Sequence, residues 1–353
     1  MPWTRLVADA PCTSGGPSHP GGGRLLTYAD ALLEAHAQAM EADPRVFVMG
    51  EGVDDPGGVF GSTLGLVQRF GPRRVMDLPI AENGCQGFAL GAAITGMRPI
   101  VVHMRCDFLF MAMDQIVNHA AKWRTMTGGR QHAPLVIRAV IGRGWGSAAQ
   151  HSQSPHGLFA GVPGLRVVMP AFADDAKGLL LSAVADPDPV LCLEHRWCYG
   201  RKAVVPPEVY FTPLGQGRLV RPGSHVTVAA VSLDVHHALE AAEAAAQQTG
   251  IEAEVLDMRS VRPFDKTLLA ESLGRTGRLV AVDSGQACCG FGAEVAAFAA
   301  SEGFSLLTGP VVRVGIADQP TPAAPALEAA HYPSVKDMTA AIIAAGEGRS
   351  WPN

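Results

Sequence analysis

The sequence predicts an α/β protein with two domains, the first built on a parallel sheet with helices on both faces and the second a smaller α/β unit. The 353 residues exceed the length of one ordinary domain and suit two. Continuous apolar runs such as "RVFVMG" at 45–50 alternate with helical patterns. This alternation is typical of strands buried on both faces of a parallel sheet. A stretch rich in Pro and Gly at 200–222 interrupts the alternation, which then restarts.

The first domain is expected over residues 24–205. Its first helical pattern begins at Thr27, an N-cap with Asp30 three residues later, and its longest one closes at Gly128 and Gly129. The expected strands are 45–50, 74–79, 98–104, 133–142, 165–170 and 189–195. One expected helix begins at 27, and a second one ends near 70. Three more are expected over 83–96, 108–129 and 173–185.

The second domain is expected over residues 223–345, after a linker at 206–222. A disordered leader over 1–23, rich in Gly, Pro and Ser, and a tail at 346–353 complete the chain. The expected strands of the second domain are 225–232, 252–258, 278–284 and 311–315, and its expected helices are 234–248, 265–275 and 292–302.

Composition narrows the class of function. A net charge of −5 gives no signal for nucleic acid or an anionic membrane, and no window reaches the roughly 18 apolar residues of a membrane span. The seven cysteines form no CxxC pair, which favours a reducing cytoplasm over a disulfide framework. We therefore expect a cytoplasmic protein that handles small molecules and contacts neither nucleic acid nor membrane.

Glu82 is the first candidate functional residue, because it precedes a run of Gly, Ala and other apolar residues in "PIAENGCQGFALGAAITGMRPI" at 79–100. As an acid at a helix N-terminus it could simply interact with the helix dipole. As a half-buried carboxyl it could instead share a proton with a ligand. The residues alone leave both readings open. The small residues behind Glu82 would let a partner helix approach closely.

A second candidate region is the loop at 144–170. His151 lies there in a Gly/Ser/Gln stretch after a strand, where parallel sheets place their sites, and it could act as an acid, a base or a loop-fixing hydrogen-bonding group. His156 is the weaker candidate. Phe108, at a strand-to-helix junction, could stack on a flat heterocycle or pack in the core.

Several motifs, in order along the chain, resemble the β subunit of the decarboxylating component of 2-oxoacid dehydrogenases, a family of oxidoreductases that includes pyruvate, acetoin and branched-chain enzymes. They are "VFVMGEGV", "DLPIAENGCQGFALGAAITGMRPI", "AMDQIVNHAAK", "AAQHSQSPHGLFAGVPGLRVVMP", "DAKGLL" and "MRSVRPFD". The resemblance covers residues 24–345. It implies a transketolase-like pyrimidine-binding domain followed by a transketolase C-terminal domain.

The resemblance also implies thiamine diphosphate and roles for individual residues. Glu82 matches the glutamate that hydrogen-bonds the aminopyrimidine ring and favours the imino tautomer, which removes the thiazolium proton. Phe108 matches the aromatic residue packed on the pyrimidine, Glu51 an acid close to the cofactor, and His151 a histidine that handles the acyl group. A potassium ion held by main-chain carbonyls would correspond to Ala183, Asp186 and Asp188.

Further implications concern partners. The family binds magnesium through a GDG motif followed by Asn-Asn, and this chain has no GDG. The resemblance therefore implies an α subunit that supplies the magnesium and diphosphate site in an α2β2 tetramer, and a lipoyl acyltransferase as acceptor.

Two alternatives remain. Arg105-Cys106-Asp107 departs from the apolar pattern common in the family, which leaves open a two-subunit carboligase that transfers an acyl or ketol unit to a carbonyl acceptor. Arg105 could recognise an acidic or phosphorylated substrate, or pair with Asp107. A non-catalytic scaffold subunit would be expected to lack Glu82 or His151, and both are present.

Overall fold

The computed structural model describes residues 22–351, which form two compact units. Unit 1 comprises residues 22–142 and 159–214, and unit 2 comprises residues 143–158 and 215–351. Residues 1–21 of the expected leader, and the last two residues of the expected tail, lie outside the described part.

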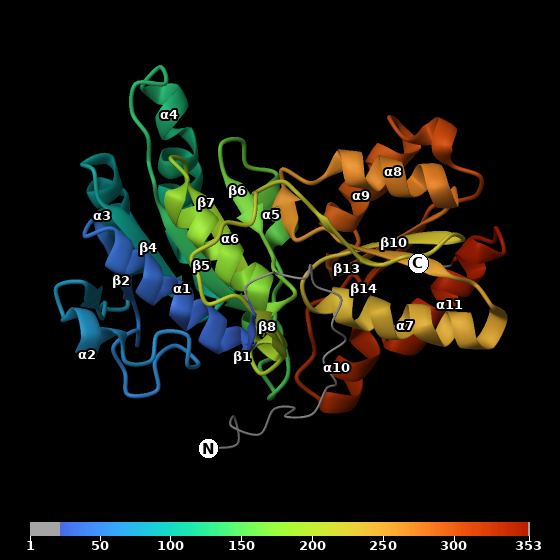
Figure 1. Ribbon diagram of the computed structural model, residues 1–353, viewed down its shortest axis with the longest axis horizontal. Helices are drawn as coiled ribbons and strands as arrows, with labels where there is room; N and C mark the ends of the chain where they lie inside the picture. Colours follow the sequence, from blue (N-terminus) through green and yellow to red (C-terminus); the bar gives the residue numbers. More distant parts are fainter. Residues whose placement is uncertain (1–21, 352–353) are drawn as a thin grey trace. The chain divides into compact units, whose positions relative to one another are not determined.

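Within unit 1, six parallel strands lie in the order β6-β7-β5-β4-β2-β3 (Figure 1). They are β2 Val46–Gly50, β3 Val75–Met76, β4 Arg98–His103, β5 Val136–Ile141, β6 Arg166–Val168 and β7 Val190–His195. Most of their side chains are buried and apolar, as the continuous apolar runs predict, and the buried Arg138 of β5 and Glu194 of β7 are charged exceptions. Because the strands are parallel, their carboxyl ends share one edge of the sheet.

The first helix of unit 1 begins where the sequence signal places it. Thr27 caps α1 (Tyr28–Ala42), with its Oγ1 accepting the Asp30 N–H at 3.1 Å. Helix α6 (Ala173–Ala185) packs beside α1 (Figure 1). The other α-helices of unit 1 are α2 Leu66–Phe70, α3 Glu82–Ile94 and α4 Trp123–Met126, and α5 His156–Ala160 spans the division between the units at 158/159. A separate antiparallel pair joins β1 Arg24–Thr27 to β8 Lys202–Val205.

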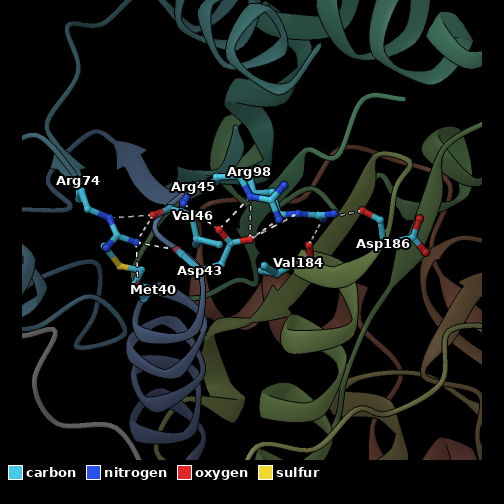
Figure 2. Close-up of polar contacts among 8 residues, drawn as sticks. All are labelled: Met40, Asp43, Arg45, Val46, Arg74, Arg98, Val184 and Asp186. Carbon is cyan, nitrogen blue, oxygen red and sulfur yellow. Dashed lines mark hydrogen bonds and ion pairs between the residues drawn. The ribbon is translucent and has the colours of Figure 1, made fainter. Parts of the chain in front are cut away.

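Two arginines fasten helix ends to the amino edge of this sheet (Figure 2). Arg74 donates to the carbonyls of Met40 and Asp43 at 2.9 and 3.0 Å, at the end of α1. Arg98, the first residue of β4, donates to the carbonyls of Val184 and Asp186 at 2.5 and 3.2 Å, at the end of α6. These bonds satisfy carbonyls that a helix terminus leaves unpaired. The opposite edge, at the carboxyl ends of the strands, is where parallel sheets usually bind ligands.

Unit 2 repeats the α/β pattern on a five-stranded sheet in the order β14-β13-β10-β11-β9, in which only β9 is antiparallel to its neighbour. Its strands are β9 Arg218–Arg221, β10 Val226–Ala230, β11 Ala253–Asp257, β13 Leu279–Gln286 and β14 Val312–Ile316, with a short β12 at Ser260–Arg262. Its helices are α7 Leu233–Thr249, α8 Lys266–Thr276, α9 Phe291–Ala300, α10 Pro325–His331 and α11 Val335–Gly346.

The helix expected over 108–129 is wrong as a continuous helix. The chain forms a 3₁₀ helix at Cys106–Ala112, a π-helical turn at Asp114–His119, a second 3₁₀ turn at Ala120–Lys122 and then α4. The π turn packs on α3, where a Cβ added to Gly87 would lie only 3.4 Å from Gln115 Oε1. Tertiary packing of this kind overrides local helix propensity.

The expected linker at 206–222 is structured at both ends. The buried Lys177 ammonium of α6 donates to Glu34 Oε1 at 2.6 Å and to the carbonyls of Pro206 and Glu208 at 2.7 and 2.8 Å, which attaches the first part to unit 1. The last part forms β9, an edge strand of unit 2. The contacts divide the units at 214/215.

Residues 143–158 group with unit 2, although we expected them inside the first domain. No helix in residues 22–351 has the length and apolarity needed to cross a membrane.

Candidate active site

A pocket in unit 1 lies at the carboxyl ends of β2 and β4. Glu51 directly after β2, Glu82 at the start of α3, and Phe108 on the 3₁₀ helix after β4 all line it. The remaining lining residues are Gly50, Leu78, Pro79, Cys85, Val101, Val102, His103 and Met104. The structure thus brings together three of the residues that the sequence analysis singled out.

The Glu82 carboxylate has no partner within residues 22–351: it makes neither a hydrogen bond nor an ion pair there. Its position in the first turn of α3 gives it the positive end of the helix dipole, and the N-cap residue Ala81 supplies no side-chain bond. The side chain is half-buried. A half-buried acid without a partner is suited to a ligand that donates a proton or a hydrogen bond.

Glu51 is a second acid in the same pocket. Burial raises the pKa of Glu51, and the charges of Glu82 and Asp77 raise it further. Asp77 itself accepts the Gly52 N–H at 2.7 Å, which fixes the turn after β2. Two neighbouring carboxyls of this kind favour a ligand nitrogen that carries or shares a proton.

His103 and Cys85 are two further titratable residues in the lining, and no sequence pattern assigns either of them a role in the site. Burial lowers the pKa of His103 to about 4, so this imidazole is neutral at pH 7; its Nε2 lies 3.3 Å from Gln86 Oε1. Burial raises the pKa of the Cys85 thiol, and Glu51 and Glu82 add to that effect. The signal for His103 was its place as the last residue of an apolar strand.

Phe108 supplies the aromatic surface of the pocket. Its backbone N–H donates to the Arg105 carbonyl at 3.3 Å, which closes a tight turn directly after β4. The half-buried ring can stack on a flat heterocycle. Acid and aromatic ring together fit the pyrimidine half of an aminopyrimidine cofactor.

His151 lies in unit 2, on the segment 143–158, and is therefore described apart from the pocket of unit 1. It is half-buried and ends a 3₁₀ turn at Ala149–His151. Trp145 and Ala148 on the same loop have φ angles of +61° and +54°, which are strained for residues other than glycine. Such strain is typical of functional loops whose surroundings enforce one conformation.

His156 fastens this loop to the rest of unit 2. Its Nε2 lies 2.7 Å from Asp283 Oδ1, and both side chains are buried. Burial lowers the pKa of His156, but the Asp283 charge overcomes that effect and leaves the pKa above its usual value. Tyr332 Oη also donates to the Ser152 carbonyl at 3.1 Å. These bonds explain why the segment belongs with unit 2.

The three residues expected around potassium lie at the end of α6, near the amino edge of the unit 1 sheet. The Asp186 carbonyl accepts from Arg98, and the Asp186 carboxylate pairs with Arg166. The Asp188 carboxylate pairs with Arg124 at 2.7 Å. Potassium ligation by Ala183, Asp186 and Asp188 stays a prediction. Across the described residues, no group of three or more His, Cys, Asp or Glu side chains could hold a metal ion.

Comparisons with known proteins agree with this architecture. The family model described as transketolase, pyrimidine binding domain, matches residues 25–201, and the model described as transketolase, C-terminal domain, matches residues 215–338. Both expected domain types are therefore confirmed.

Two proteins of similar sequence and one solved structure of similar fold support the same comparison. The chain is 43% identical over 323 residues to acetoin:2,6-dichlorophenolindophenol oxidoreductase subunit beta of Bacillus subtilis, covering 88% of this chain and 94% of that protein. It is 41% identical to the mitochondrial pyruvate dehydrogenase E1 component subunit beta-1 of Arabidopsis thaliana, covering 92% and 90%. A solved structure titled split gene transketolase, inactive beta4 tetramer, matches with a TM-score of 0.77 at 25% identity, covering 92% of this chain and 99% of that chain.

Proposed function

Because the chain belongs to the family that joins a transketolase pyrimidine-binding domain to a transketolase C-terminal domain, we propose that it is the β subunit of a thiamine diphosphate-dependent 2-oxoacid dehydrogenase. The names of its relatives, beta subunits of pyruvate dehydrogenase and of an acetoin oxidoreductase, support this assignment. The observation that carries it is the Glu82 carboxylate, partnerless within residues 22–351 and facing the same pocket as Phe108.

Each pocket residue has a role in this proposal. Glu82 accepts a hydrogen bond from a protonated ring nitrogen of the aminopyrimidine, and Phe108 stacks on that ring. The raised pKa of Glu51 limits the negative charge beside Glu82. Thiamine diphosphate held by these residues would supply a carbon nucleophile for the 2-oxoacid carbonyl. The low-polarity lining of Val101, Val102 and Met104 keeps water away from this hydrogen bond.

The proposal includes an α subunit in an α2β2 assembly. The chain lacks the GDG motif for magnesium and diphosphate, so we assign these ligands to the α subunit. The name of the split-gene relative, an inactive beta4 tetramer, supports the need for a second chain. Around the pocket, Ile80, Phe88 and Met111 are 84%, 58% and 65% exposed, an apolar surface suited to a partner.

We assign His151 to handling the acyl group during its transfer to a lipoyl carrier on an acyltransferase. A histidine can exchange a proton near pH 7, as acyl transfer to a thiolate requires.

The test uses this chain alone and purified together with its α subunit. Calorimetric titration with thiamine diphosphate and magnesium is expected to show tight binding only for the complex. Decarboxylation of 2-oxoacids is then followed with a lipoylated carrier domain or an aldehyde as acceptor. The expected product is an acylated lipoyl group on the carrier domain. Tight cofactor binding by the isolated chain would refute the split site, and carboligation without acyl-lipoyl formation would replace the dehydrogenase with a carboligase.

A further inference from the structure

Arg196 directly follows β7, at the same carboxyl edge of the unit 1 sheet as the pocket. Its guanidinium carbon lies 4.6 Å from the centre of the Phe60 ring and 5.3 Å from that of Tyr199. Within residues 22–351 the Arg196 guanidinium makes neither a hydrogen bond nor an ion pair. A half-buried guanidinium that stacks on aromatic rings and uses none of its five N–H donors there is ready to bind an anion.

The nearest acid along the chain is already engaged. Glu194, two residues earlier, receives bonds from Arg138 Nε at 2.6 Å and Nη2 at 2.5 Å, and from Tyr199 Oη at 2.6 Å. Its carboxylate is buried with these partners. The Arg196 charge is therefore not balanced by Glu194.

A second guanidinium contacts Gly142, the residue that follows β5. Arg105 Nη1 donates to the Gly142 carbonyl at 3.1 Å. A Cβ added to Gly142 would lie only 3.2 Å from Arg196 Cβ, so Arg196 packs directly against this glycine. Burial lowers the pKa of Arg196; Tyr199 opposes that shift, and the like charge of Arg105 adds to it. Both arginines thus contact one glycine, and the Asp107 carboxylate acts on the charge of Arg105.

This pair of arginines adjoins the pocket. Arg105 follows Met104, which lines the pocket, and its carbonyl accepts the Phe108 N–H. The strands β4, β5 and β7, after which Arg105, Gly142 and Arg196 lie, are neighbours in the sheet. A substrate that reacts at the pocket could therefore extend along the carboxyl edge toward the arginines.

Phe60, the ring under Arg196, provides an independent sign of a functional position. It is 40% exposed, and its φ of +49° is strained for a residue other than glycine. Strain at an exposed aromatic residue indicates that the fold enforces its position rather than tolerates it.

We propose that Arg196, together with Arg105, forms a subsite for an anionic group at the far end of the substrate, a carboxylate or a phosphate-like group. This inference rests on the proposed function and deepens it, because it selects 2-oxoacids that carry a second anion over those with an apolar side chain.

The kinetic test compares α2β2 enzyme containing wild-type chain, Arg196→Met, Arg196→Lys or the exposed control Arg73→Met. The substrates are 2-oxoglutarate and its phosphonate counterpart 2-oxo-4-phosphonobutanoate, which carry a second anionic group, and 2-oxopentanoate, whose side chain is neutral. Loss of a charge-assisted bond predicts a fall in kcat/KM of about 10-fold or more for the anionic substrate in Arg196→Met. Arg196→Lys should retain part of the preference, and Arg73→Met all of it.

The outcomes of this comparison support or contradict the anionic subsite. The preferred anion identifies the carboxylate or the phosphonate as the natural group. An equal effect of Arg196→Met on anionic and neutral substrates, or no preference for either anion in the wild type, overturns the subsite. Loss of assembly with the α subunit in Arg196→Met also overturns it, because Arg196 would then be an interface residue.

A binding measurement separates this inference from the proposed function. Glutarate and 4-phosphonobutanoate are titrated calorimetrically into the assembled complex without cofactor. Saturable binding of one of them that Arg196→Met abolishes is expected even if no 2-oxoacid is turned over. Turnover of neutral 2-oxoacids without anion binding would retain the proposed function and remove the subsite.

Discussion

At the scale of single residues, the pocket is defined by two acids that the fold places side by side. Glu51 follows a buried strand and Glu82 begins a helix, so each position is fixed by the backbone rather than by a salt bridge. Holding like charges together costs free energy in the absence of a ligand. A ligand that shares a proton with this pair recovers that free energy on binding.

The pair predicts a pH dependence of stability for the unliganded chain. The folded-state pKa of Glu51 is raised by burial, then by Glu82 and Asp77, so the native state binds more protons than the unfolded chain. Stability from this group is present below its unfolded pKa, near 4.3, and is lost as pH rises through the folded pKa. In urea unfolding, Glu51→Gln should therefore lose less stability than wild type as pH rises above about 4.3.

The exposed Glu271→Gln variant is the matched control and should follow the wild-type profile. A steeper loss of stability in Glu51→Gln than in wild type would show that Glu51 is not the strained acid of the pocket.

At the scale of elements, a buried ion pair joins β5 to β7. Arg138 donates to both oxygens of Glu194 and also contacts His36 Nε2 at 3.1 Å and Ser62 Oγ at 3.2 Å. Arg138→Met leaves a buried carboxylate without its cation, which should cost about 3–5 kcal/mol of unfolding free energy. Chemical denaturation of the purified variant measures this loss.

The double variant Arg138→Met/Glu194→Met is the control for that prediction. It removes both charges and should recover a large part of the lost stability. If the double variant is as unstable as the single one, packing rather than the unpaired charge determines the cost.

A second prediction at this scale concerns the segment 143–158. The raised pKa of His156 means that its ion pair stabilises the segment below the unfolded pKa of about 6.5 and is lost as pH rises through the folded pKa. Burial raises the pKa of Asp283, but His156 and the Gly292 and Gly285 amides hold it below its usual value. Over the range in which His156 titrates, Asp283 therefore stays charged.

Hydrogen exchange measured by mass spectrometry, corrected for intrinsic rates, should show protection of 143–158 falling as pH rises above neutral. Asp283→Asn should lower the protection and remove its dependence on His156 titration. Unchanged protection in Asp283→Asn would mean that Tyr332 and other contacts hold the segment without the ion pair.

Local sequence patterns predict some of these structural elements and not others. The apolar strands and the Thr27 cap follow from local rules and were predicted. The π turn at 114–119 was not, because it depends on packing against α3. The attachment of 206–208 to Lys177 likewise joins residues distant in sequence, which no local pattern encodes.

Some residues of the candidate site could likewise be identified from the sequence, and others could not. Glu51, Glu82 and Phe108 could be identified because a family resemblance supplied roles for residues that composition left undecided. His103 and Arg196 could not, since each matters through neighbours on other strands: Gln86 beside His103, and Phe60 and Gly142 beside Arg196.

At the scale of the whole molecule, the central claim is that this chain supplies one half of a cofactor site. In the proposed function, the acid and the aromatic ring of unit 1 bind the pyrimidine, and the diphosphate end is assigned to an α subunit. Glu82 is the residue on which that claim depends, because its carboxylate has no partner within residues 22–351.

The most direct test is the rate at which the thiazolium C2 proton of thiamine diphosphate exchanges with deuterium in the assembled α2β2 complex, measured by quenched flow and NMR. Glu82→Gln, with Glu271→Gln as control, should assemble and still bind the cofactor, but should exchange at least ~10²-fold more slowly than wild type, as expected when an acid–base group is lost. Exchange in Glu82→Gln at a rate close to wild type would contradict the account.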